Sequence, residues 1–154
     1  MKTIAVLGTG HMGAPIARRL LASGDPAALD RVEPVLSALG AVRRCGRLGA
    51  GAAMKLVANT ALVTAVTALA DTLAVAEALG VDRDAALEVV GAGALGGVAG
   101  RLGGGSAFSV ALAAKDLDLA LRALGTAPAP VARGAAAALS TVEDRGADLG
   151  AIAQ

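Results

Sequence analysis

The spacing of apolar and polar residues predicts a short α/β segment followed by a long helical part. Residues 3–7, TIAVL, form a brief apolar run before a glycine, which is typical of a buried parallel strand. Residues 52–79 hold few polar side chains and predict one long helix that Gly80 closes, with Asp71 as the candidate point for a break. The uncharged run between Lys55 and Asp71 is about 22 Å long as a helix, shorter than a ~30 Å bilayer core, so we expect a buried helix and no membrane span.

Capping residues mark a helix early in the chain. Asp25 and Pro26 are typical of an N-cap and a first helical residue, and the helix that they start should run to Leu39. Gly40 ends it, and residues 41–45, AVRRC, predict a short strand or an extended lead into the next turn.

Beyond the long helix, the pattern predicts shorter helices separated by loops. Asp82 is a candidate N-cap for a helix over residues 84–90. Residues 91–105 are so rich in glycine that we expect a mobile loop there. Phe108, the lone phenylalanine, should be a packing anchor rather than a substrate contact.

A further helix should open at Lys115 and Asp116, with Asp116 orienting neighbouring groups or capping backbone donors. A loop over residues 125–130 should separate it from an alanine-rich helix that reaches about Arg145 and leads into a weak tail.

A glycine-rich turn near the start of the chain is the candidate cofactor site. Gly8, Gly10 and Gly13 form a GxGxxG pattern between the predicted strand and a helical stretch. Such glycines permit a tight turn and a close approach of the backbone to a pyrophosphate, whose charge a helix N-terminus accepts. Thr9, His11 and Met12 complete this predicted cofactor-binding turn, and His11, the one histidine, is interpreted as a loop residue without acid–base duty.

The expected continuation of a nucleotide-binding fold is not found after this turn. A second strand should end about 20 residues past the glycines with a residue that recognises the ribose. Here residues 24–26 start a helix instead, and its charged residues, Asp30, Arg31 and Glu33, belong to a solvated face. None of these three residues is therefore predicted to be a ribose ligand.

Lys55 and Asn59 are the candidate catalytic residues. They are four positions apart, so on a helix they project from the same face. An unpaired ammonium costs several kcal/mol to bury, so this lysine is expected to face a cleft, where it can exchange a proton with a substrate oxygen. The residues alone favour a simpler interpretation, in which the lysine extends to water near the start of its helix.

Composition narrows the class of partner. The 154 residues carry a net charge of +1, from 14 basic and 13 acidic side chains, and 1% are aromatic, so a nucleic-acid partner is not expected. The single cysteine, Cys45, cannot form an internal disulfide, which suits a reducing cytoplasm. We expect its side chain to be small, apolar and buried. The predicted strand begins directly after Lys2, so no signal peptide is predicted. No metal site is expected in this sequence.

Three motifs together resemble the β-hydroxyacid dehydrogenase family. Residues 46–59, GRLGAGAAMKLVAN, resemble the catalytic signature of this family, which includes 3-hydroxyisobutyrate dehydrogenase, tartronate semialdehyde reductase and the more distant imine reductases. Residues 8–20, GTGHMGAPIARRL, resemble its dinucleotide-binding start, and residues 115–120, KDLDLA, resemble its second conserved lysine motif. The motifs occur in the order that the family has.

The resemblance implies a mostly α fold. Residues 1–48 would form a truncated, Rossmann-like α/β segment, and residues 49–154 an all-helical dimerisation domain that includes the long interdomain helix. Most of the nucleotide domain would then be absent, with the join near residues 23–25. The family's substrate-binding motif of a serine and paired glycines would be absent with it.

The resemblance also implies an activity, which is NAD- or NADP-dependent oxidation of a small 3-hydroxy acid or reduction of the semialdehyde. Lys55 would be the general acid/base, Asn59 would hold the substrate, and Lys115 would lie near the nicotinamide or substrate. The glycines of the turn over residues 8–13 would meet the pyrophosphate. The alternative is a shortened relative that forms a helical homodimer without catalysis.

Overall fold

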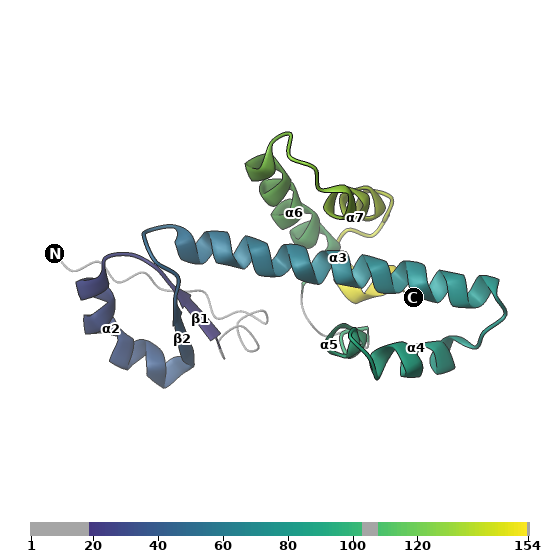
Figure 1. Cartoon of the computed structure of the whole chain (residues 1–154), viewed down its shortest axis with the longest axis horizontal. Helices are drawn as coiled ribbons and strands as arrows, with labels where there is room; N and C mark the ends of the chain where they lie inside the picture. The colour runs from purple at the N-terminus through teal and green to yellow at the C-terminus, as the bar shows by residue number, and fades with distance from the viewer. Residues whose placement is uncertain (1–18, 103–107, 154) are drawn as a thin grey trace. The chain divides into compact units, whose positions relative to one another are not determined.

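The computed structural model describes residues 19–102 and 108–153 (Figure 1). The chain forms two compact units, Met1–Lys55 and Leu56–Gln154. The described residues are mostly helical and contain one short α/β segment, as the sequence predicts. The predicted strand over residues 3–7 and the glycine turn over residues 8–13 lie outside the described residues.

The first unit contains a strand–helix–strand motif. Strand β1 (Arg19–Ala22) pairs in parallel with β2 (Ala41–Arg44), and helix α2 (Pro26–Leu39) connects them. The ladder is in register from Arg19 opposite Ala41 to Ala22 opposite Arg44. The expectation that no second strand lies between the glycine turn and this helix was wrong. Four residues are too few to show a clear alternation of apolar and polar positions. The backbone groups that bond to β1 belong to β2, which follows α2 in the sequence.

The caps of α2 are those that the sequence predicts. The Asp25 carboxylate accepts a hydrogen bond of 2.8 Å from the backbone N–H of Ala28, and Pro26 is the first helical residue. At the other end, the N–H of Gly40 donates to the carbonyl of Leu36 at 3.2 Å. These local signals fix both ends of the helix.

Ion pairs hold α2 against β2 on the solvent side. The Arg44 guanidinium binds the carboxylates of Glu33 and Asp30, the latter at 2.7 Å. The hydrogen bond that Arg44 donates to Glu33, and then the one that it donates to Asp30, raise the pKa of Arg44, so the side chain stays cationic. The carboxylates on this helix therefore have a structural partner, which agrees with their exclusion as ribose ligands.

Each glycine in the turn between β2 and helix α3 (Ala50–Ala78) has its own physical reason. Gly46 and Gly49 have φ angles of 104° and 89°, which L side chains rarely adopt. Gly51 is buried, and a Cβ at this position would lie 3.0 Å from the carbonyl oxygen of Leu21 and 3.2 Å from Oγ of Ser23. The turn thus needs two glycines for conformation and one for close contact.

We expect Gly51→Val to lower the free energy of unfolding by about 1–3 kcal/mol, because the side chain would press on the backbone at the end of β1. The matched control is Ala52→Val, which places the same β-branched side chain at an exposed position in the same helical turn. Thermal unfolding followed by circular dichroism measures both. Equal losses in the two variants would contradict the close-contact explanation.

Helix α3 is continuous through Asp71, so the candidate break there does not occur. Gly80 closes it with a φ of 70°, as predicted. Its core side chains Val63, Val66 and Leu69 are at most 1% exposed. Other apolar side chains of the helix are open to solvent, so the expected burial holds for one face only. By length and composition α3 could cross a membrane, a test that the central helix of a soluble protein also passes.

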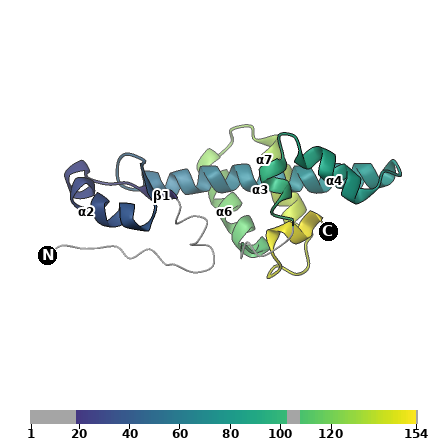
Figure 2. The same cartoon turned by 90° about the horizontal axis from the view of Figure 1, so that it is seen from below.

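In the second unit, α4 (Arg83–Gly91) and α5 (Gly96–Ala99) run beside the later part of α3 (Figures 1 and 2). The Asp82 carboxylate caps α4 by accepting from the N–H of Ala85 at 2.9 Å, as predicted. Helix α5 lies in the stretch expected to be a loop, because apolar side chains between its glycines reach the core. That core comprises Leu69, Leu73, Leu102 and Ala153, against which Ala86, Leu87, Val90, Leu95, Val98 and Ala99 pack.

Helix α6 (Val110–Leu124) packs against α7 (Pro130–Ser140). Ser109 caps α6 by accepting from the N–H of Leu112 at 3.3 Å, so the helix begins earlier than its predicted start at Lys115. The apolar residues before Lys115 carry the first turn of the helix, and Val110 is fully buried there. Phe108 is 3% exposed, which confirms its role as a packing anchor.

The C-terminal segment is packed rather than a weak tail. Helix α7 ends at Ser140, not near Arg145, and the chain then returns to the start of α6. The carbonyls of Arg145 and Ala147 accept from the N–H groups of Ala111 and Val110 at 2.9 and 3.0 Å. A 3-10 helix, η1 (Leu149–Ala153), completes the segment with Leu149 buried. These backbone bonds explain both corrections, because the residues after α7 satisfy the first turn of α6.

Candidate functional site

A buried carboxylate connects helices α3 and α6 within the second unit. Asp116 is 2% exposed, and its Oδ2 accepts a hydrogen bond of 2.6 Å from Nδ2 of Asn59. Its Oδ1 lies 2.9 Å from the ammonium of Lys115. Asn59 is in α3 and the other two residues are in α6, so one carboxylate connects two helices that are far apart in the sequence.

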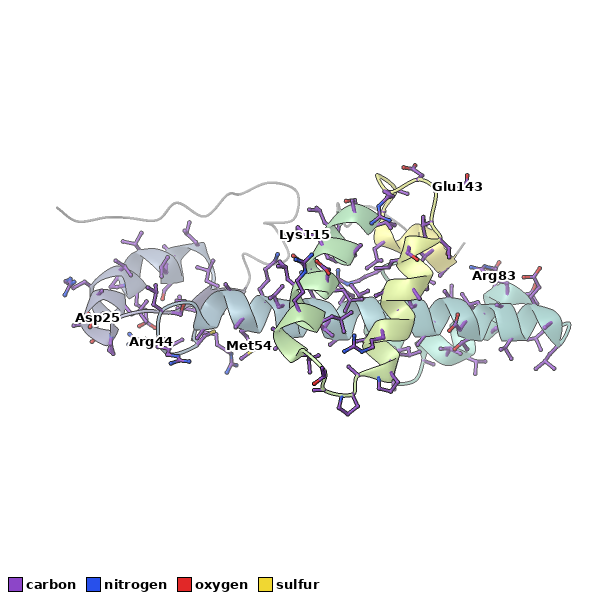
Figure 3. The ribbon with its side chains drawn as sticks, turned by 90° about the horizontal axis from the view of Figure 1, so that it is seen from above. Asp25, Arg44, Met54, Arg83, Lys115 and Glu143 are labelled. Atoms are coloured by element: carbon purple, nitrogen blue, oxygen red, sulfur yellow. The ribbon has the colours of Figure 1, made fainter. Side chains whose placement is uncertain are left out.

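Lys115 presents its charge to solvent although its ammonium is paired. The Lys115 side chain, labelled in Figure 3, is 56% exposed. The Asp116 side chain that it pairs with is 2% exposed. A pair with one exposed member stays accessible to a ligand in a way that a fully buried pair does not. The residue can therefore meet an anionic or hydrogen-bonding group without losing its anchor.

Lys55 lies one helical turn before Asn59 in α3, and both side chains are half-buried. Because side chains at positions i and i+4 share a helix face, the spacing that the sequence predicts is preserved in the structure. The assignment of Lys55 and Asn59 to catalysis stays a prediction, as does that of Lys115 to cofactor binding.

The predicted pyrophosphate turn, Gly8 to Gly13 with Thr9, His11 and Met12, lies outside the described residues. Within residues 19–102 and 108–153, no three His, Cys, Asp or Glu side chains gather as a metal site would require. The described part of the candidate site is thus a cluster of amide, carboxylate and ammonium groups.

The sequence indicated a smaller role for Asp116 than for Lys55, Asn59 and Lys115. We expected Asp116 to orient nearby groups, and it does bind Asn59 and Lys115. Its burial and the identity of Asn59 as its partner could not be predicted from the motif alone. The signal available in the sequence was an aspartate directly beside the motif lysine.

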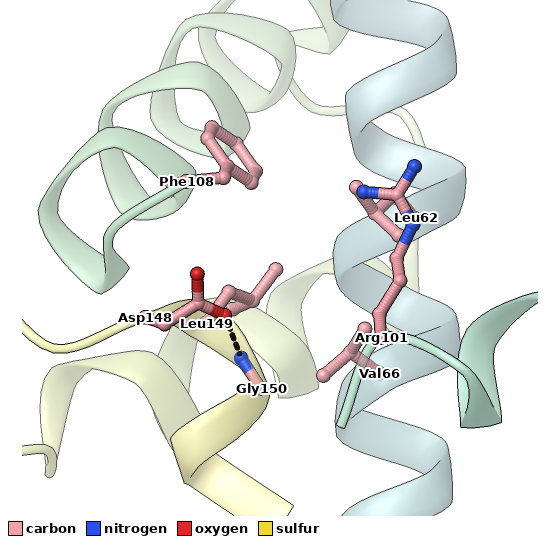
Figure 4. Close-up of a pocket in the computed structure, with 7 residues that line it drawn as sticks. All are labelled: Leu62, Val66, Arg101, Phe108, Asp148, Leu149 and Gly150. Atoms are coloured by element: carbon pink, nitrogen blue, oxygen red, sulfur yellow. Dashed lines mark hydrogen bonds between the residues drawn. The ribbon is translucent and has the colours of Figure 1, made fainter. Parts of the chain in front are cut away.

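Two hollows in the described parts of the chain do not make a substrate site. A cavity of about 10 Å³ between α3 and the C-terminal segment has room for no more than one water molecule (Figure 4). It is lined by Leu62, Val66, Arg101, Phe108, Asp148, Leu149 and Gly150.

The second hollow, of about 340 Å³, lies in the first unit at the carboxyl ends of β1 and β2. Pro26, Leu29, Arg44 and Arg47 contribute to its mostly apolar wall. None of the candidate residues Lys55, Asn59 and Lys115 lines this hollow.

Comparison with known protein families decides what kind of chain this is. The family model for the NAD-binding region of NADP-dependent 3-hydroxyisobutyrate dehydrogenase matches residues 49–152, well over half of the chain. The chain belongs to the 3-hydroxyisobutyrate dehydrogenase family. The matched region of this family includes α3 and α6, and with them Lys55, Asn59 and Lys115.

Curated relatives in the family agree with this assignment. The chain is 32% identical to a probable 3-hydroxyisobutyrate dehydrogenase of Mycobacterium bovis, over 152 aligned positions that cover 87% of this chain and 51% of that protein. Proteins of the same name from Mycobacterium tuberculosis match to the same extent. The chain therefore spans about half the length of the curated relatives that it matches.

Solved structures of the family share the fold. A 3-hydroxyisobutyrate dehydrogenase from Mycobacterium tuberculosis, determined with L-serine, superposes with a TM-score of 0.77 at 26% identity, covering 92% of this chain and 56% of that chain. A 3-hydroxyisobutyrate dehydrogenase from Salmonella typhimurium gives 0.69 at 28% identity, covering 85% and 51%. The helical arrangement described above is that of this dehydrogenase family.

NAD or NADP is the cofactor that membership in this family implies. The described residues suit one end of such a molecule. Lys115 presents an exposed ammonium and Asn59 a half-buried amide, and both are hydrogen-bond donors of the kind that a nicotinamide carboxamide oxygen accepts from. Their assignment to the cofactor stays a prediction, and the predicted phosphate-binding turn lies outside the described residues.

Proposed function

We propose that the protein is an NAD(P)-dependent oxidoreductase that interconverts a small 3-hydroxy acid and its semialdehyde, acting as a homodimer in the cytoplasm. The observation that supports this most is the bond network of Asn59, Asp116 and Lys115, which joins the two motifs of the family through one carboxylate. A purely structural helix pair would not need a buried carboxylate at the contact, since apolar side chains would stabilise it equally well.

In this proposal Lys55 transfers the proton. As the hydroxy acid is oxidised, the Lys55 amine takes the hydroxyl proton, and in the reverse direction the ammonium returns it to the carbonyl oxygen. Asn59, one helical turn away, holds the same substrate oxygen. A bound nicotinamide would supply or accept the hydride. Lys115 would bind the nicotinamide carboxamide or the substrate carboxylate, at the position where Asp116 anchors it.

The test of this proposal is turnover. Purified protein is supplied with NAD or NADP and a series of small 3-hydroxy acids, and NADH or NADPH formation is followed by absorbance. We expect turnover with at least one acid, and 2-hydroxy acids of the same size serve as the control for position of the hydroxyl.

The second candidate function is a non-catalytic helical dimer, which the coverage favours because the chain spans about half of its relatives. This function would give a folded dimer with no turnover on any small hydroxy acid and no binding of either cofactor. The turnover assay and a cofactor titration therefore separate the two functions.

We expect the cofactor to bind more weakly than a Kd of about 1 µM, or ~8 kcal/mol, with little preference between NAD and NADP. Carboxylates near the ends of the two described strands already have partners, since Asp25 caps α2 while Asp30 and Glu33 hold Arg44. They are not available to recognise a ribose hydroxyl. Calorimetric titration with each dinucleotide measures this, and sub-micromolar binding with a strong preference for one of them would contradict it.

A further inference from the structure

Asp116 is unusual among the described residues in its environment. Among the polar and charged side chains of the described residues, only those of Thr67 and Asp116 are buried, and Asp116 is the charged one of the two. A carboxylate removed from water costs several kcal/mol unless hydrogen bonds and an opposite charge compensate it. Both of its oxygens are used in this way, Oδ2 by the Asn59 amide and Oδ1 by the Lys115 ammonium.

We propose that Asp116 is a positioning residue that fixes the orientation of the Asn59 amide in the site. An ionised carboxylate only accepts hydrogen bonds, so the N–H side of the Asn59 amide must face it. The carbonyl oxygen of Asn59 is then directed away from Asp116 and is held as an acceptor. The second N–H of the same amide is held as a donor.

Within the proposed function, this orientation defines how Asn59 meets the substrate. The hydroxyl that is oxidised has one proton, which Lys55 on the same helix face takes, so Asn59 holds the same oxygen through its second N–H. If the amide were free to rotate, either its oxygen or its nitrogen could face the substrate. Asp116 thus fixes which atoms of Asn59 face the substrate, and this part of the inference rests on the proposed function.

The second oxygen of Asp116 extends the effect to Lys115. The ammonium of Lys115 is anchored by a buried partner while most of its side chain remains exposed. Loss of the carboxylate would therefore release two groups at once, an amide on α3 and an ammonium on α6. Removal of either group alone would leave the other one held.

Helix α6 offers a matched control. Asp118 lies two residues beyond Asp116 and pairs with Arg122 at 2.7 Å, but its side chain is 53% exposed. The hydrogen bond and charge of Asp118 raise the pKa of Arg122, as expected for a surface ion pair. Asp116→Asn and Asp118→Asn remove the same charge from the same helix, one at a buried connection and one on the surface.

The first measurement does not depend on activity. Asn59 is the only asparagine and Gln154 the only glutamine, so the side-chain amide region of a ¹⁵N-correlated NMR spectrum of the natural chain contains two pairs of signals. We expect the Asn59 pair to show one strongly shifted, hydrogen-bonded proton. Asp116→Asn should move that pair, since an amide partner permits either orientation of Asn59, and Asp118→Asn should leave it in place.

Asp116→Ala serves as a second variant because it adds no new amide signal. In either Asp116 variant, helical circular dichroism establishes that the protein is folded. An Asn59 signal pair that stays unchanged in folded Asp116→Asn would overturn the proposal. This outcome is independent of turnover, so it is distinguishable from a failure of the proposed function.

The kinetic measurement tests positioning against a merely structural role. Asp116→Asn should lower kcat by at least about 10-fold and up to about 100-fold, because Asn59 and Lys115 lose their alignment. Asp116→Glu, which restores the charge on a longer side chain, should recover part of the loss, and Asp118→Asn should keep natural kcat and KM. Equal kinetics for Asp116→Asn and Asp118→Asn would overturn the positioning role.

Discussion

Replacing Lys55 by alanine should lower the turnover of small 3-hydroxy acids by at least about 100-fold, and by as much as about 10,000-fold, while helical circular dichroism stays unchanged. The side chain is half-buried on the same face of α3 as Asn59, so its loss removes the proton-transferring group and leaves the substrate contact. Steady-state kinetics with saturating cofactor measures the effect on kcat.

Two further variants separate proton transfer from charge. Lys55→Arg keeps a cation of similar length, but a guanidinium does not release its proton in a protein, so turnover should also be lost. Lys115→Ala should raise KM more than it lowers kcat, because Lys115 is assigned to binding rather than to proton transfer. Turnover that survives in Lys55→Ala would refute the catalytic assignment.

The protein should be an obligate dimer, detected as twice the chain mass by light scattering at micromolar concentration. Exposed apolar side chains lie near both ends of α3, with Met54 at 42% and Val57 at 64% near its start, and Val75 at 57% and Leu79 at 74% around its end. The members of each pair are three or four residues apart, so each pair forms an exposed apolar patch on one face. A second copy of the chain is the partner that would cover them.

Val57→Lys should shift this equilibrium toward the monomer by at least about 10-fold, or ~1.4 kcal/mol, because burial of an unpaired ammonium is costly. The control is Val35→Lys on α2, where the natural side chain is similarly exposed, at 68%, but lies in the first unit. A cooperatively folded monomer of the natural chain would refute the dimer.

The helices whose ends depend on neighbouring residues could be predicted from the sequence. Asp25 and Asp82 cap their helices, and Gly40 and Gly80 end theirs, because each of these signals acts within one helical turn. The glycines of the turn before α3 were equally visible, although the contact that restricts Gly51 was not.

Features that depend on distant partners could not be predicted. Strand β1 forms because it pairs with β2, which comes after α2 in the sequence. Its four residues are too few to show the alternation of apolar and polar positions that predicts a strand. The burial of Asp116 depends on Asn59, which is 57 positions away in the sequence. The end of α7 and the packing of η1 depend in the same way on the first turn of α6.

The return of the C-terminal segment to α6 also bears on the order in which the protein is made. The strand–helix–strand motif of the first unit is complete once Arg44 has been synthesised. The first turn of α6 receives its bonds only after Arg145 and Ala147 have followed. Since chains fold from the N-terminus as they leave the ribosome, the helix that carries Lys115 and Asp116 gains these two bonds only after the first unit and α7 have been synthesised.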